Sequence, residues 1–213
     1  MDYITGEPPL DALPSGPSER DRGWARLVSD ILSPPVVWGA LALPIAFRDA
    51  PSREQGLSWA GVYILMVCIV PIVYIAWMVR RGKITDLHMR VRTQRILPFV
   101  VSLIATAIAW WTLRAMGAPP VIPLLALSSF AQIGLMALIT LVWQISMHMM
   151  SIASAFVTTG LLFGTAPALI ILPLVFVVAA ARLKLKRHTF MQVIAGTIVG
   201  LSVPATLILN AAL

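Results

Sequence analysis

The chain has few charged side chains and a single cysteine. Asp, Glu, Lys and Arg make up only 12% of its 213 residues, whereas 59% are hydrophobic, and the mean hydropathy is +0.87. A soluble domain of this size could not cover itself with polar surface, so this composition excludes that class and predicts an integral membrane protein. The one thiol, Cys68, excludes a disulfide within the chain.

Charge is also missing from long parts of the chain. No Asp, Glu, Lys or Arg occurs in the 67 residues from 115 to 181, and none follows Arg187. Backbone amides in hydrocarbon have no water to bond, and these stretches lack the period-two alternation of a membrane barrel strand. We therefore expect an all-α fold, a polytopic transmembrane helical bundle of six or seven spans.

The apolar segments give the expected span boundaries, since a helix needs about 20 residues to cross a bilayer. The expected spans are 29–47, 57–79, 96–113, 121–143, two short helices divided by the Gly and Pro residues of 160–167, and 189–209. Pro34, Pro35 and Pro44 predict a kink or an interfacial course in the first span, which would leave six. Residues 1–28, which show no signal-peptide pattern, are expected to form a flexible or interfacial tail, and 29–213 the transmembrane domain.

Basic residues gather in three regions, 20–26, 80–95 and 182–187, which seven spans would place at one membrane face. The positive-inside rule predicts that this face is cytoplasmic, in a plasma (inner) membrane protein. Such residues are often only anchors for lipid phosphates. Nucleic acid is a poor partner for the net charge of +7, because these residues flank spans and do not line a groove on a soluble module.

All three histidines, His88, His148 and His188, are expected at this same face. Ionisable groups at membrane depth are expensive and usually mark a functional site. Three spacings recur there: Lys83 and Arg90 with six residues between them, Ser146 and His148 on either side of Met147, and Arg182 and His188 with five residues between them, followed one helical turn later by Gln192.

In this order the three motifs resemble those of the type 2 phosphatidic acid phosphatase superfamily. That family carries Lys, six residues, Arg-Pro; then Pro-Ser-Gly-His; then Ser-Arg, five residues, His, three residues, Asp. The resemblance covers residues 83–192, about half of the chain, and keeps every cationic and imidazole position. The chain departs from the family pattern at Val91, Ile145, Met147, Ala181 and Gln192.

The resemblance implies a membrane lipid phosphatase that hydrolyses a lipid phosphate or an isoprenoid diphosphate. It implies that His188 attacks phosphorus to form a phosphohistidine and that His148 protonates the departing alcohol. No metal and no cofactor are implied, and the lipid tail would enter from the bilayer. The substrate phosphate would be bound by cations and a hydroxyl, namely Lys83, Arg90, Arg182 and Ser146.

Two positions leave the site open to alternatives. Gln192 replaces the family's Asp, so it can orient the nucleophilic imidazole but supplies no charge. Asp86, the only carboxylate after Glu54, could substitute for that Asp or pair with a site cation, or could be a solvated loop residue. Arg95 precedes Ile-Leu-Pro and could take the phosphate-binding role of Arg90 in a longer loop.

Two other functions fit the same residues. A phosphohistidine could pass its phosphate to another alcohol, which would make the chain a lipid phosphotransferase. Alternatively, a chain that has lost the activating Asp could be a non-catalytic binder or transporter of lipid phosphates.

Overall fold

The structure, a computed structural model, describes residues 23–84 and 92–211. This part of the chain is helical and contains no strand, which confirms the expected all-α fold. The elements, in chain order, are α1 (Gly23–Ile31), α2 (Pro34–Arg48), α3 (Arg53–Tyr63), the π-helix η3 (Ile64–Ile69), α4 (Val70–Arg80), the 3-10 turn η4 (Arg92–Arg95), α5 (Ile96–Ala115), α6 (Val121–Thr140), α7 (Met147–Phe163), α8 (Thr165–Lys184) and α9 (Phe190–Ala211).

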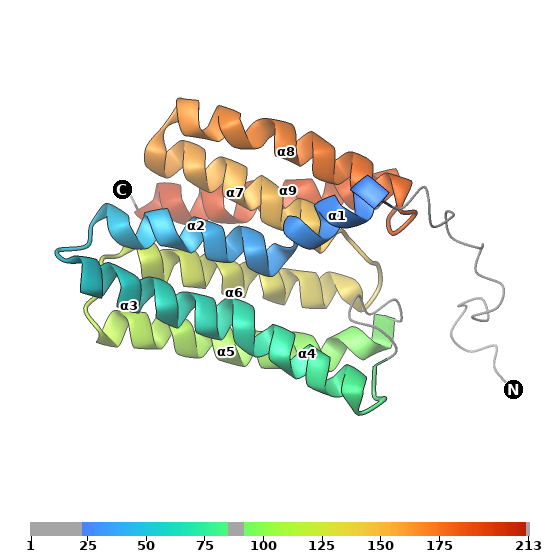
Figure 1. Ribbon diagram of the computed structural model, residues 1–213, viewed down its shortest axis with the longest axis horizontal. Coiled ribbons are helices and arrows are strands. Elements are labelled where there is room, and N and C mark those ends of the chain that lie inside the picture. The colour runs from blue at the N-terminus through green and yellow to red at the C-terminus, as the bar shows by residue number, and fades with distance from the viewer. Residues whose placement is uncertain (1–22, 85–91, 212–213) are drawn as a thin grey trace, which may run out of the picture.

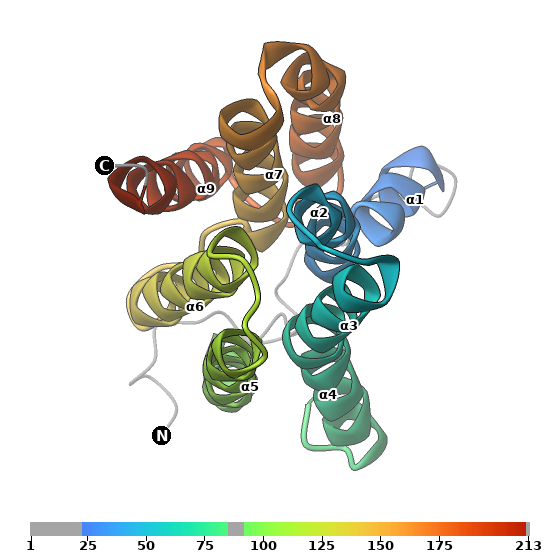
Figure 2. The same cartoon turned by 90° about the vertical axis from the view of Figure 1, so that its left-hand side faces the viewer.

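The helices lie side by side along one bundle axis (Figure 1). Viewed from one end of the bundle, α7 has α2, α8 and α9 around it (Figure 2), and it packs against all three. Nine of its 17 residues are buried, including the run from Met149 to Ala155. This central helix therefore contacts helices from distant parts of the chain and holds them close together.

Five segments are long and apolar enough to cross a membrane. They are the continuous helix Arg53–Arg80, formed by α3, η3 and α4, together with α5, α6, α8 and α9. The bent pair α1 and α2 makes a sixth if it counts as one span. The remaining expected span, α7, is apolar but has only 17 residues, or about 25 Å of helix. It is separated from α8 by Gly164, whose φ of 93° ends the helix within the predicted 160–167 break.

The predicted interruption of the first span lies between α1 and α2, which are bent by 44°. Pro34 and Pro35 have no N–H group to donate to the preceding turn, and Ser33 takes an extended conformation with ψ of 151°. α1 begins at Gly23, so the expected boundary between residues 28 and 29 falls within a helix. The bend places the last turn of α1 against α8.

Close packing between α7 and α9 depends on two glycines. A Cβ atom at Gly196 would collide with the backbone carbonyl of Ser146, and one at Gly200 would collide with that of Met150. The backbone N–H of Ser146 also donates to the carbonyl of Gln192 at 3.1 Å. The start of α7 is thereby held directly against the start of α9.

We predict that Gly200→Ala destabilises the protein by about 1–3 kcal/mol, because the added methyl group overpacks the interface of α9 with α7. The measurement is the thermal unfolding midpoint of the purified protein in detergent. Gly61→Ala is the matched control, since nothing lies within 4 Å of a Cβ at that helical position. It should be neutral or slightly stabilising. Equal midpoints for both variants would contradict the role given to Gly200.

Candidate functional site

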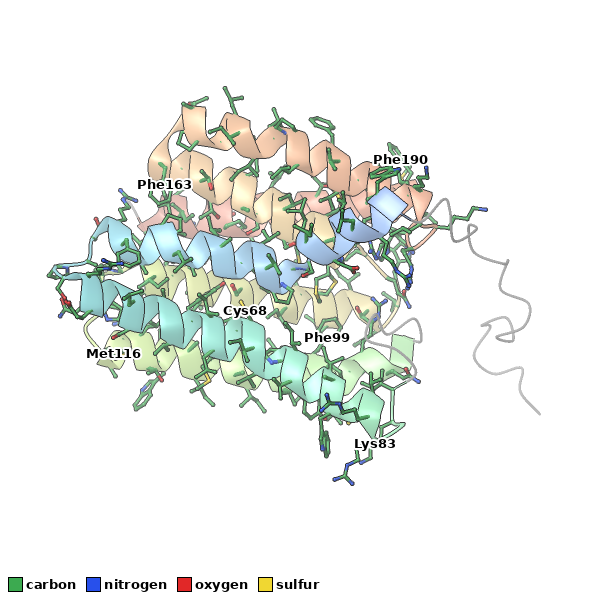
Figure 3. All side chains as sticks on the ribbon, in the orientation of Figure 1. Cys68, Lys83, Phe99, Met116, Phe163 and Phe190 are labelled. Carbon is green, nitrogen blue, oxygen red and sulfur yellow. The ribbon has the colours of Figure 1, made fainter. Side chains whose placement is uncertain are left out.

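A pocket of about 350 Å³ opens at the end of the bundle where α1 meets α2. Lys83 and Phe190 lie at this end, whereas Met116 and Phe163 lie at the other (Figure 3). The connectors that follow α4 and α8 thus share one end of the bundle, as the sequence indicated. The pocket is lined by polar residues from five parts of the chain: Ser29, Asp30, Ser33, Arg95, His148, Arg182 and His188.

His188 lies between α8 and α9, and a hydrogen bond defines its tautomer. Its Nδ1 is 3.3 Å from Oε1 of Gln192, and that oxygen also accepts from the backbone N–H of Thr189 at 3.0 Å. An oxygen can only accept, so Nδ1 of His188 carries the proton. The other ring nitrogen, Nε2, therefore keeps a lone pair when the ring is neutral. Gln192 takes the orienting role expected of it.

The surroundings of His188 keep its ring neutral. Burial lowers the pKa of His188 to about 3, and the positive charges of Arg182, Arg95 and Arg187 act in the same direction. The hydrogen bond to Gln192 opposes this shift but does not overcome it. At physiological pH the imidazole is therefore unprotonated at Nε2, which is the form that can act as a nucleophile.

His148 lies in the first turn of α7 and is held by α1. Its Nε2 is 3.0 Å from the backbone carbonyl oxygen of Ser29. Since a carbonyl only accepts, Nε2 of His148 carries a proton. The two histidines of the pocket thus present opposite forms, one with a lone pair at Nε2 and the other with a proton there. The lone pair on Nε2 of His188 is the form that a nucleophile requires, and the Nε2–H of His148 is used in its contact with Ser29.

Arg182 is a buried cation in the last turn of α8, with 5% of its surface exposed. One of its terminal nitrogens, Nη1, donates to the hydroxyl of Ser29 at 3.4 Å. Its Nε is buried and has no hydrogen-bond partner, and no carboxylate of the described residues forms an ion pair with it. A buried charge that no hydrogen-bonded carboxylate neutralises is costly, and Asp30 acts on Arg182 only through space, so this guanidinium indicates a site for an anion.

Ser146 takes a different role from the one expected. Its hydroxyl accepts from the backbone N–H of Met149 at 3.4 Å and caps the start of α7. The residue is fully buried and does not line the pocket. Ser146 therefore orients the helix that carries His148, and its own hydroxyl does not face a ligand.

Of the site residues expected from the first motif, only Lys83 and the alternative cation Arg95 lie within the described residues. Lys83 is exposed, with Nζ 5.8 Å from the ring centroid of Trp77, and it does not line the pocket. The expected contact of Lys83 with phosphate is thus not seen, because the side chain lies along the outside of α4. Arg95, the alternative cation of this motif, does line the pocket. Asp86, His88 and Arg90 lie outside the described residues.

α1 and the turn that follows it contribute to the pocket, which none of the three sequence motifs indicated. Ser29, Asp30 and Ser33 all line the pocket, and Ser29 contacts both His148 and Arg182. One signal was present, because Asp30 is an acid within a segment expected to span the membrane, and such acids usually serve a function. The site therefore has a carboxylate close to its cations, from a part of the chain that precedes all three motifs.

Comparisons with protein-family models, curated proteins and solved structures found no match. The fold and the pocket alone define the class of protein: a helical bundle with apolar helices long enough to span a membrane and a cationic pocket with two histidines at one end.

We predict that the ring of His188 stays neutral from pH 8 to pH 5, since its pKa is lowered from 6.5 to about 3. The measurement is ¹⁵N NMR of histidine-labelled protein in detergent without phosphate, with the signal assigned by its loss in His188→Ala. The expected spectrum shows a protonated Nδ1 and an unprotonated Nε2 throughout this range. Free histidine in the same buffer is the control and titrates near ~6.5. Titration of His188 near that value would contradict the burial and charge described above.

Proposed function

We propose that this chain is a membrane lipid phosphatase that forms a phosphohistidine at His188. One observation carries the proposal, namely that the lone pair of His188 Nε2 lies in the same pocket as a buried arginine whose Nε has no acceptor among the described residues. A phosphate monoester offers both an electrophilic phosphorus and the oxygens that such an arginine needs. The motif resemblance points to the same chemistry.

The phosphate is proposed to lie between Arg182 and Arg95, which both line the pocket. Two guanidinium groups offset the two negative charges of a phosphate monoester, and each can donate hydrogen bonds to two of its oxygens. Asp30 offsets part of this positive charge while the site is empty. A bound phosphate would supply an acceptor to Nε of Arg182, which has none among the described residues.

In the first chemical step Nε2 of His188 attacks phosphorus, and the bond between phosphorus and the ester oxygen breaks. For this step His148 carries a proton on each ring nitrogen: Nδ1 gives its proton to the departing oxygen, so the lipid alcohol leaves uncharged, while the Nε2–H stays on the carbonyl of Ser29. The hydrogen bond from Nδ1 of His188 to Gln192 remains in place and supports the ring as it becomes positively charged. This step leaves a phosphohistidine at residue 188 and a neutral His148 that keeps its proton on Nε2.

In the second step a water molecule attacks the phosphorus of the phosphohistidine. Nδ1 of His148, now without its proton, accepts one from this water, and the bond between phosphorus and Nε2 of His188 breaks. Inorganic phosphate leaves, and both histidines regain their starting forms. The two steps divide one difficult displacement into two easier ones.

The apolar wall of the pocket fits a lipid tail. It consists of residues from α2, α4, α5 and α7, namely Pro34, Pro35, Ile72, Ile75, Phe99 and Met147. We propose that the tail of a phosphatidate or an isoprenoid phosphate lies along this wall while its phosphate faces the arginines. The basic end of the bundle is proposed to face the cytoplasm of a plasma (inner) membrane protein, in accord with the positive-inside rule.

One observation favours a second function, a lipid-phosphate binder without turnover. Gln192 carries no charge, so it stabilises the positive imidazole of the attack less than a carboxylate would. Transfer of the phosphate to another alcohol would be a third outcome of the same intermediate. The experiments below distinguish these three functions.

We predict that the purified protein releases inorganic phosphate from phosphatidic acid or farnesyl diphosphate in detergent. His188→Ala should abolish release, and His148→Gln should slow it by about 10²–10⁴-fold because the acid is lost. Release is measured by a colorimetric phosphate assay. The matched control is Arg114→Gln, which removes an exposed arginine that lies over Trp110 at the end of α5. It should leave the rate unchanged.

The pattern of outcomes separates the proposed functions. Binding of lipid phosphate that requires Arg182, without release, would favour the non-catalytic binder. Phosphate that appears on an added alcohol instead of in solution would favour the phosphotransferase. Full activity of a folded His188→Ala variant would contradict both catalytic functions.

We predict that Gln192→Glu raises the hydrolysis rate by about tenfold. The carboxylate would occupy nearly the same place as the amide, accept from Nδ1 of His188, and add the negative charge that stabilises the positive ring during attack. It would also raise the pKa of His188. The measurement is kcat for phosphate release together with the histidine NMR titration. A raised pKa with an unchanged or lower kcat would contradict the idea that missing charge at residue 192 limits the rate.

A further inference from the structure

Ser29 is the one residue of α1 that bonds to two pocket residues from different helices. Its backbone carbonyl accepts from Nε2 of His148 in α7 at 3.0 Å, and its hydroxyl accepts from Nη1 of Arg182 in α8 at 3.4 Å. The side chain is buried, with 3% of its surface exposed. A single residue thus contacts both the proposed acid and the proposed phosphate-binding cation.

The carbonyl of Ser29 can accept from His148 because α1 ends just after it. In a continuous helix this oxygen would accept from the N–H of Ser33, four residues later. Here Pro34 and Pro35 hold Ser33 in an extended conformation, and α1 stops at Ile31. The proline break thereby leaves the carbonyl oxygen of Ser29 without a helical partner, and Nε2 of His148 donates to it.

The hydroxyl of Ser29 decides which edge of the guanidinium remains open. With Nη1 of Arg182 bonded to Ser29, the edge formed by Nε and Nη2 has no acceptor among the described residues. That edge is one of those through which an arginine binds two oxygens of a phosphate or carboxylate in parallel. The contact therefore orients the arginine toward an anion without using the donors that the anion needs.

We infer that Ser29 is a positioning residue that holds Arg182 and His148 in the orientations needed to bind and protonate a phosphate ester. The inference rests on the proposed function for the identity of the anion. It adds α1, which lies outside all three motifs, to the machinery of the site. Ser33 is a matched control, because it lines the same pocket and its hydroxyl makes no hydrogen bond in the described part of the chain.

We predict that Ser29→Ala weakens binding of inorganic phosphate by about fivefold to tenfold, the effect of losing one hydrogen bond that orients a charged group. Ser29→Thr, which keeps the hydroxyl, should restore it, and Ser33→Ala should bind as the wild type does. Binding is measured with the full chain in detergent by isothermal titration calorimetry. The KM for phosphatidic acid should rise by the same factor while kcat changes less.

A second readout tests the contact in the absence of any anion. The protein is labelled with ¹⁵N-arginine, and the Arg182 signals are assigned with Arg182→Lys. A guanidinium held at Nη1 should show separate Nη1 and Nη2 signals, because rotation about the bond between Nε and Cζ is hindered. These signals should merge in Ser29→Ala and stay separate in Ser33→Ala. Merged signals in the wild type, or unchanged signals in Ser29→Ala, would overturn the inference.

The contact with His148 is tested by removing the proline break. In Pro34→Ala/Pro35→Ala the backbone can continue as helix, so the carbonyl of Ser29 can accept from Ser33 instead. The ¹⁵N spectrum of His148 should then lose its preference for a proton on Nε2, and an unchanged spectrum would oppose the inference. If the wild type fails to bind phosphate while the arginine signals behave as expected, the proposed function fails and the positioning role of Ser29 stands.

Discussion

The contact between α7 and α9 is the constraint on which the site depends. Gly196 and Gly200 have no Cβ atom, so α9 can lie directly against the backbone of α7. The N–H of Ser146 also donates to the carbonyl of Gln192. His148 is carried by the first turn of one helix, and His188 immediately precedes the other. Because the helices touch at these ends, two histidines separated by a long hydrophobic stretch of chain line one pocket.

Electrostatics give that pocket its chemical character. Arg182 is buried, Arg95 lines the same pocket, and the positive charge of both helps to keep His188 neutral. The same charges that disfavour a proton on His188 favour a phosphate beside it. A single arrangement of charge would thus serve the proposed phosphatase twice, because it would attract the anion and keep the Nε2 lone pair of His188 available.

Helix boundaries were largely predictable, because they follow from local properties. The length of each apolar segment predicted the spans. The helix breaks at Gly164 and Pro34 lie where the glycine and proline residues of the sequence predicted them. Of the site, the chain order of basic and histidine residues predicted that Arg182, His148 and His188 share one end of the bundle. Motif spacing grouped Lys83 with the site cations, but spacing alone could not show that its side chain lies over Trp77 and does not line the pocket.

The sequence by itself determined that the chain is helical and apolar enough for membrane spans, because hydrophobic length and scarcity of charge depend only on composition and order. It also determined which ionisable residues occur near helix ends. Only the tertiary structure decided that Ser29 and Asp30 join the site, that Ser146 caps a helix, and that Nδ1 of His188 holds its proton toward Gln192. These features depend on how helices distant in sequence pack and on which hydrogen-bond partner reaches each atom, and no local pattern encodes that.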